Sequence, residues 1–175
     1  MVKRKGIIIG ILIGLVGICF MPLSQNIDIV LDGKEYRIGN SEYEEDRTIE
    51  IQGKYKDYLF RDDTFEGKIN IGGYNFLDKY DETNFTVVDE VASLRYYGVD
   101  QGRTIITSFG AMAFSNNFKE VLICVDEPAS ESSSKSWTSE NGLFIVAPAT
   151  NHELDLLLAK KLSKKSDWLS GVKWK

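Results

Sequence analysis

Three acidic side chains stand close together in the chain, Asp62, Asp63 and Glu66. Paired carboxylates of this kind could hydrolyse a glycosidic bond, a reaction that needs two carboxyl groups about 5 to 9 Å apart across a groove. Neighbours within one turn seldom reach that separation, and a charged loop beside Phe65 explains the same residues. A small surface hydrolase that uses loop carboxylates is therefore the alternative hypothesis for this protein.

A second group of polar side chains could hold a calcium ion. The alternating residues are Asp78, Tyr80, Glu82 and Asn84. An EF-hand loop needs an oxygen ligand at its third position, glycine at its sixth and glutamate at its twelfth, where this chain has Tyr80, Thr83 and Asp89. A looser calcium-binding loop or a solvated acidic turn are the two remaining interpretations, and the second is favoured. One histidine and two separated cysteines predict no zinc site.

Nucleophilic catalysis has little support in the sequence. His152 is the one histidine that could act as a base, and we interpret it as an exposed side chain in the first turn of a helix. The run Ser132-Ser133-Ser134-Lys135 resembles the Ser-x-x-Lys spacing of penicillin-binding proteins, but the Ser-Asp-Asn and Lys-Thr-Gly partner motifs do not occur. We therefore assign no catalytic, cofactor-binding or metal-binding residue and expect no cofactor.

The elements that would position such residues are mainly β-strands, because apolar side chains repeat with a period of two. The alternating residues begin with Ile27, Ile29, Leu31, Tyr36 and Ile38. Asp32-Gly33 interrupts them, and a two-residue loop there would pair Ile29 with Tyr36. A second hairpin is expected at Gly72-Gly73, with Ile71 opposite Tyr74.

Further strands are predicted at residues 85–88, 94–99, 104–114, 121–125 and 143–147, and Asp100-Gln101-Gly102-Arg103 looks like a hairpin connection. The runs 121–125 and 143–146 are continuously apolar, so both should be central strands covered on both faces. A helix at about residues 151–165 could cover them. Thr150 and Glu153 have capping-box spacing there. The apolar stripe of this helix is Leu154, Leu157, Leu158 and Leu162.

The predicted fold is therefore mainly β (α+β), an antiparallel sheet or sandwich with one C-terminal covering helix. A serine-rich stretch at residues 130–139 is expected to form a mobile loop between two core strands. Several aromatic side chains fall at strand period and either pack in the core, which is favoured, or line a ligand surface. They are Tyr55, Tyr58, Phe60, Tyr74, Phe76, Tyr96 and Tyr97.

The N-terminal segment predicts a membrane location. Lys3-Arg4-Lys5 precedes an uncharged run of 18 residues, 6–23, which as a helix is about 27 Å long and just spans a hydrocarbon core of about 30 Å. An uncleaved anchor is favoured over a cleaved signal peptide, because no small-x-small pair precedes a cut, and over lipidation of Cys19, because Ile18 precedes it. The flanking cations keep the N-terminus cytoplasmic, so the chain would be a single-pass cell-membrane protein with its C-terminal domain outside.

This organisation divides the chain into residues 1–24, a cytoplasmic tail and anchor, and residues 25–175, one extracytoplasmic domain. Without its three N-terminal cations the chain has 18 basic and 26 acidic residues, a net charge of −8, which disfavours nucleic acid as a partner. Gly6, Gly10 and Gly14 share one face of the anchor, where a second helix could approach.

The expected partners are therefore membrane lipid through the N-terminal helix and a protein partner or a second copy through the glycine face. The expected function is a membrane-anchored extracytoplasmic interaction or binding module with no identifiable catalytic set.

The orientation gives a first prediction. Protease added outside intact cells should digest the body of the chain, because the cations Lys3, Arg4 and Lys5 hold the N-terminus inside. Replacing all three with neutral residues should yield a mixture of orientations and partial protection. Unchanged accessibility in this variant would show that charge does not orient the chain.

Overall fold

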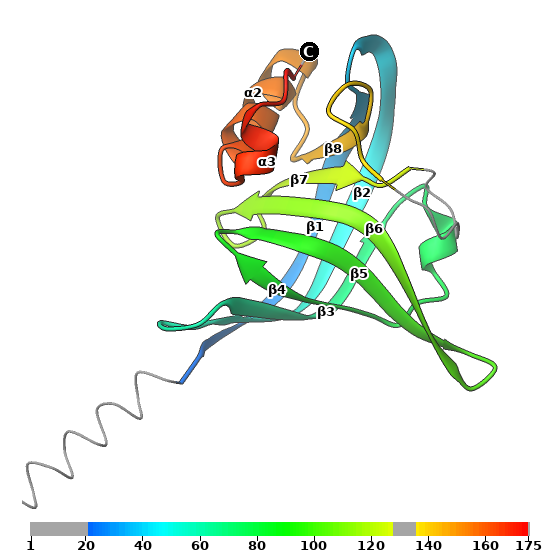
Figure 1. Cartoon of the computed structure of the whole chain (residues 1–175), viewed down its shortest axis with the longest axis vertical. Helices are drawn as coiled ribbons and strands as arrows, with labels where there is room; N and C mark the ends of the chain where they lie inside the picture. Colours follow the sequence, from blue (N-terminus) through cyan, green and yellow to red (C-terminus); the bar gives the residue numbers. More distant parts are fainter. Residues whose placement is uncertain (1–20, 128–135, 175) are drawn as a thin grey trace, which may run out of the picture.

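The computed structural model describes residues 21–127 and 136–174. These residues form eight strands, a one-turn 3-10 helix and two α-helices (Figure 1). The strands are β1 (Leu23–Arg37), β2 (Asn40–Asp57), β3 (Asp63–Ile71), β4 (Glu82–Val88), β5 (Val91–Asp100), β6 (Arg103–Ser115), β7 (Glu120–Val125) and β8 (Leu143–Ala147). The helices are η1 (Asn75–Leu77), α2 (His152–Ser163) and α3 (Asp167–Ser170).

The eight strands form one closed antiparallel barrel in which each strand pairs with its neighbours in sequence. The barrel closes where β1 pairs with β8, from Lys34 opposite Val146 to Arg37 opposite Leu143. Closure pairs the last four residues of β1 with β8, whereas residues 23–33 of β1 form ladder pairs with β2 alone. The predicted mainly β antiparallel fold with a C-terminal helix is confirmed, and it takes the form of a barrel.

One of the three predicted hairpins is present and two are wrong. β5 and β6 are joined through Gln101 and Gly102, both with positive φ, as the hairpin prediction requires. Gly73, with φ of +88°, also lies in a turn, but η1 follows it and β3 pairs with β4 much later in the chain. The hairpin at Asp32-Gly33 does not exist, because β1 runs straight through it and turns at Gly39.

The course of β1 explains the wrong hairpin. Ile27 and Glu35 point into the barrel, whereas Tyr36 points outward beneath α2, so the second half of the strand is buried on both faces. Along β1 the apolar residues change from odd positions, such as Ile27, to an even position, Tyr36. This change shows where α2 begins to cover the outer face of the strand, and it does not indicate a turn. Gly33 is needed for close packing, since a Cβ there would lie 3.0 Å from the Val146 carbonyl oxygen.

Aromatic rings fill the barrel interior, as expected for eight strands, whose interior is just wide enough for side chains. The end of the barrel that holds the β2–β3, β4–β5 and β6–β7 turns is called the base below. Phe118 closes it, fully buried, with its ring stacked on Phe114 at 4.0 Å and 5.5 Å from Tyr55. Its φ of +65° is unfavourable for a bulky residue, and burial of the ring offsets that cost.

A second apolar layer lies outside the barrel, where α2 and α3 pack on β6, β7, β8 and β1 (Figure 1). Leu122 and Phe144 are fully buried beneath these helices, while their neighbours Ile123 and Ile145 are fully buried inside the barrel. The prediction that β7 and β8 are covered on both faces is confirmed.

The predicted stripe of α2 is partly wrong. Leu154 and Leu157 are 49% and 55% exposed, whereas Leu162 is fully buried and Leu158 packs at the edge of the layer. The rotation of the helix is fixed by Asp155, which accepts hydrogen bonds from the Tyr36 hydroxyl at 2.7 Å and the Thr150 amide at 2.8 Å. These contacts lie on the helix face that carries Ala159 and Leu162, so they turn the other two leucines outward.

The N-terminus of α2 also differs from its prediction. The N-cap is Asn151, whose side chain accepts a hydrogen bond from the Leu154 amide at 3.0 Å. Thr150 was expected in this role, but its own amide is bound by Asp155. The helix therefore begins one residue later than the capping box indicated.

The last residues of the predicted anchor are not helical, since Leu23 is the first residue of β1 and pairs with Asp57. Residues 1–20, with Cys19 and the glycine face, lie outside the described residues. So does most of the serine-rich stretch, of which residues 136–139 are described. None of the helices in the described ranges has the length and apolarity to cross a bilayer.

The helix packing gives a second prediction. Leu162→Ala should lower the free energy of unfolding by about 2 to 5 kcal/mol, because it leaves a cavity between helix and barrel. Leu157→Ala is the matched control and should change it by less than about 0.5 kcal/mol, because that side chain is exposed. Denaturant unfolding of the two variants measures this difference, and equal losses would contradict the observed helix rotation.

Candidate functional site

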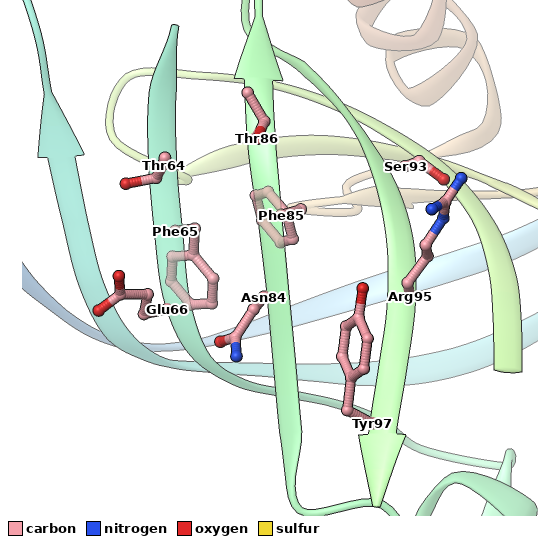
Figure 2. A pocket seen from close by; sticks show the side chains of 9 residues that line it. All are labelled: Thr64, Phe65, Glu66, Asn84, Phe85, Thr86, Ser93, Arg95 and Tyr97. Atoms are coloured by element: carbon pink, nitrogen blue, oxygen red, sulfur yellow. The ribbon is translucent and has the colours of Figure 1, made fainter. Parts of the chain in front are cut away.

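An open groove on the outer wall of the barrel is the best candidate for a ligand site (Figure 2). It crosses β3, β4 and β5 and has a volume of about 440 Å³. Nine residues line it: Thr64, Phe65, Glu66, Asn84, Phe85, Thr86, Ser93, Arg95 and Tyr97. We call it the β4–β5 groove.

The groove lies over an interruption of the barrel wall. β4 and β5 pair Thr83 with Tyr96, and pairing resumes only at Val87 with Ala92. The register is the same on both sides, so residues 84–86 and 93–95 are separated locally and not shifted. The backbone groups of these residues are therefore not paired across the β4–β5 seam.

A β-bulge lies in β6, on the other side of β5 from the interruption. Leu94 pairs with Gly110 and Arg95 with Ser108, so Phe109 is the extra residue, and a bulge bends the strand that carries it. Gly110 has a φ of +144°, and its missing Cβ leaves room for the Cys124 carbonyl oxygen. The glycine thus allows β6 to lie close to β7 next to the bulge.

Strand alternation sets the lining of the groove. Residues of even number on β3 and β4, and of odd number on β5, point outward, so hydroxyl, amide and charged groups form the rim. Phe65 and Phe85 form the floor, with ring centroids 5.0 Å apart and an interplanar angle of 16°. Figure 2 shows the Tyr97 ring between the β4 and β5 ribbons. The Arg95 side chain lies on the side of β5 that faces away from β4.

The charges of the groove are distributed unequally. Glu66 is held by Lys56, whose Nζ lies 2.7 Å from its carboxylate. Asn84 accepts a hydrogen bond from the Gly67 amide at 3.2 Å and donates one to Glu82 at 2.9 Å. Arg95 is exposed and has no acidic partner among the described residues. A ligand in the groove therefore meets one cation that is free to form an ion pair.

Two buried hydroxyl groups lie where the interruption begins. The Thr83 and Tyr96 side chains face each other inside the barrel, and neither hydroxyl meets hydrogen-bond geometry with any described group. Burial raises the pKa of Tyr96, and the neighbouring Thr83 hydroxyl lowers it. Both hydroxyl groups lie inside the barrel and are not among the residues that line the outer groove.

A second polar cluster lies inside the barrel around Glu35, which is 1% exposed. Its carboxylate accepts hydrogen bonds from the Tyr43 hydroxyl at 2.7 Å, from the Tyr74 hydroxyl, and from Arg47 at 3.0 and 3.2 Å. Burial, followed by the hydrogen bond to Glu35, raises the pKa of Tyr43 to about 12. Both carboxylate oxygens are occupied, so this cluster joins β1, β2 and the β3–β4 connection and leaves no group for chemistry.

The carboxylates of the hydrolase hypothesis do not converge. Asp63 accepts hydrogen bonds from the Tyr55 hydroxyl at 2.5 Å and the Tyr58 amide at 2.8 Å, whereas Glu66 points outward. Residues three apart on a strand face opposite sides, so these two cannot flank one substrate. Asp62 is exposed in the preceding turn. Asp63 therefore has a structural role, and Glu66 lies on the rim of the groove.

The predicted calcium ligands are also separated. Tyr80 is buried in the interior, while Glu82 and Asn84 belong to β4 and bond to each other. Asp78 caps the 3-10 helix. No group of three or more acidic, histidine or cysteine side chains within the described ranges could hold a metal ion.

The remaining candidates are structural or lie elsewhere. His152 is half-buried in the first turn of α2, with its ring 5.0 Å from that of Tyr36. Cys124 is fully buried, and burial raises the pKa of its thiol. The Ser132–Lys135 motif lies outside the described residues.

Of the aromatic residues considered, Tyr55, Tyr74 and Tyr96 are buried in the core, as favoured, and Tyr97 lines the groove. Arg95, which lines the groove from β5, was not identified from the sequence. Alternation within the predicted strand 94–99 places it outward beside Tyr97, but nothing in the sequence indicates that the ladder opens there. Comparison with family models, curated proteins and solved structures found no match to this chain.

The cluster around Glu35 gives a third prediction. Arg47 forms ion pairs with two acids, the buried Glu35 and the exposed Glu45, so the two contributions to stability can be compared. Glu35→Ala should cost about 3 to 5 kcal/mol, since it leaves a buried guanidinium without its main partner. Glu45→Ala is the matched control, since Glu45 is 50% exposed, and should cost less than about 1 kcal/mol. Denaturant unfolding compares the two, and similar losses would mean that the cluster does not hold the interior together.

Proposed function

We propose that this protein is a membrane-anchored extracytoplasmic binding module whose β4–β5 groove takes a small ligand. The observation that carries the proposal is the interrupted ladder, which exposes backbone groups between a polar rim and an aromatic floor. A break in a ladder gives up hydrogen bonds, and a bound molecule would restore them.

The lining favours a small amphipathic anion. Arg95 supplies a charge-assisted hydrogen bond to a carboxylate or a sulfonate. Tyr97 and the floor rings Phe65 and Phe85 suit an apolar or aromatic portion of the ligand. Ser93 and Thr86 add hydroxyl groups on the rim, so polar specificity and apolar contact come from the same groove.

Binding is favoured over hydrolysis by the arrangement of charges. Among the nine lining residues the charged side chains are Glu66 and Arg95, and Glu66 is already paired with Lys56. Such a lining can hold and orient a ligand, but it offers no nucleophile beside a base.

The location completes the proposal. The apolar run at residues 6–23 would anchor the chain in the cell membrane, and the cations before it would place the barrel outside. The partners are then membrane lipid through this helix and a protein partner or a second copy through the glycine face. Nucleic acid is not proposed as a partner, because the exported part is acidic.

The groove gives a fourth prediction. The anionic aromatic dye 8-anilinonaphthalene-1-sulfonate should bind the purified protein, and Arg95→Ala should weaken its affinity about tenfold, the effect of losing one charge-assisted hydrogen bond. Fluorescence titration measures the affinity, and nuclear magnetic resonance shifts of β4 and β5 residues locate the dye.

Arg103→Ala is the control, since Arg103 is an exposed arginine at the far end of the β5–β6 hairpin and lies outside the groove. Its affinity should equal that of the unaltered protein. Equal affinity in the Arg95 and Arg103 variants, or shifts confined to other strands, would exclude the groove as the binding site.

A further inference from the structure

Exposed apolar side chains gather at the base of the barrel, where β1 begins. Met21, Leu23, Leu59 and Phe60 are 69%, 70%, 70% and 66% exposed. Large apolar side chains seldom cluster in solvent without a binding role. We call residues 58–61, the tip of the β2–β3 turn, together with Leu23 the basal tip.

The ladder brings these residues together from two segments. Leu23 pairs with Asp57, and Leu59 and Phe60 come two and three residues after Asp57 in the chain. Figure 1 shows the tip of the β2–β3 turn beside the start of β1 at the lower left of the barrel. The apolar run at residues 6–23 ends at this same point.

We propose that the basal tip inserts into the surface of the bilayer that holds the anchor. This inference rests on the anchored location proposed above. Because the apolar run ends at Leu23, the basal tip is the part of the barrel nearest the membrane, and no linker separates the two.

The chemistry of the tip suits the boundary between headgroups and acyl chains. Leu59 and Phe60 supply apolar area, and Tyr58 is of the type that lies at membrane interfaces. The Arg61 guanidinium stacks over the Tyr58 ring at 3.6 Å, so its charge lies close to the aromatic face. Asp57 and Asp62 flank the tip, so its net charge gives no attraction to anionic lipid, and the contact would depend on apolar insertion.

The opposite end of the barrel gives an internal comparison. Val99 and Ile106 are also exposed there, on the β5–β6 hairpin. In an up-and-down barrel this hairpin lies at the end away from the β2–β3 turn, so it should remain in water when the base meets the membrane.

The experiment uses the full chain in phosphatidylcholine vesicles, with Cys19 and Cys124 replaced by alanine and one fluorophore attached at a new cysteine. Asp62→Cys places the label on the loop of the basal tip, and Gln101→Cys places it on the distant hairpin. Lipids that carry a nitroxide near the headgroup should quench the label at position 62 and leave the label at position 101 unchanged.

The decisive variant is Leu59→Ser with Phe60→Ser, which removes the apolar contact and leaves the anchor intact. Quenching at position 62 should fall to the level of position 101, while the melting temperature stays the same because both side chains are exposed. Quenching that persists in this variant, or that is absent from the start, would overturn insertion of the tip.

Flotation of the vesicles separates this inference from the anchor. A chain that floats with the vesicles but shows no quenching at position 62 overturns the tip contact alone. A chain that does not float overturns both the anchor and the contact. Replacing part of the phosphatidylcholine with phosphatidylglycerol should not alter the quenching, and a strong increase would overturn the apolar mode of contact in favour of electrostatic attraction.

Discussion

The pairing of β1 with β8 is the interaction on which the rest of the structure depends. It covers four residues of β1, Lys34 to Arg37, and it turns an open sheet into a barrel. The same segment serves both apolar layers, since Glu35 points inward to Arg47 and Tyr36 points outward to Asp155. Interior, wall and helix layer therefore meet in two adjacent residues, whose opposite directions follow from the pleat of the strand.

Closure of the barrel also limits where strand backbone is left without a ladder partner. The interrupted β4–β5 ladder is one of the places in the barrel where strand backbone lacks a ladder partner, besides residues 23–33 of β1 on the side of β8. Here the interruption lies across β5 from a bulge in β6 at Phe109, and Arg95 stands beside it above two stacked rings. The groove lining begins at Thr64, three residues after the basal tip ends at Arg61, so the proposed ligand site lies next to the proposed membrane contact.

Several features follow from the sequence alone. Local sequence patterns were sufficient to predict features that depend on residues within one element. Examples are the turn at Gln101-Gly102 and the strands β7 and β8, which are buried on both faces. The presence of a C-terminal helix that covers them was equally readable, because its cations and capping residues lie within one segment. The antiparallel β class was predictable for the same reason, since alternation is a property of each strand.

Tertiary structure decided the features that depend on a distant partner. Asp32-Gly33 has turn chemistry, but coverage of β1 by α2 and β8 makes it part of a strand. Leu154 and Leu157 fit an apolar stripe, yet the hydrogen bond between Asp155 and Tyr36, 119 residues apart, turns them into solvent. The sequence by itself determined strands, turns and the covering helix, because neighbouring residues fix these. Closure of the barrel, rotation of the helix and opening of the groove required the whole fold, because each depends on contacts between segments that the chain order does not place together.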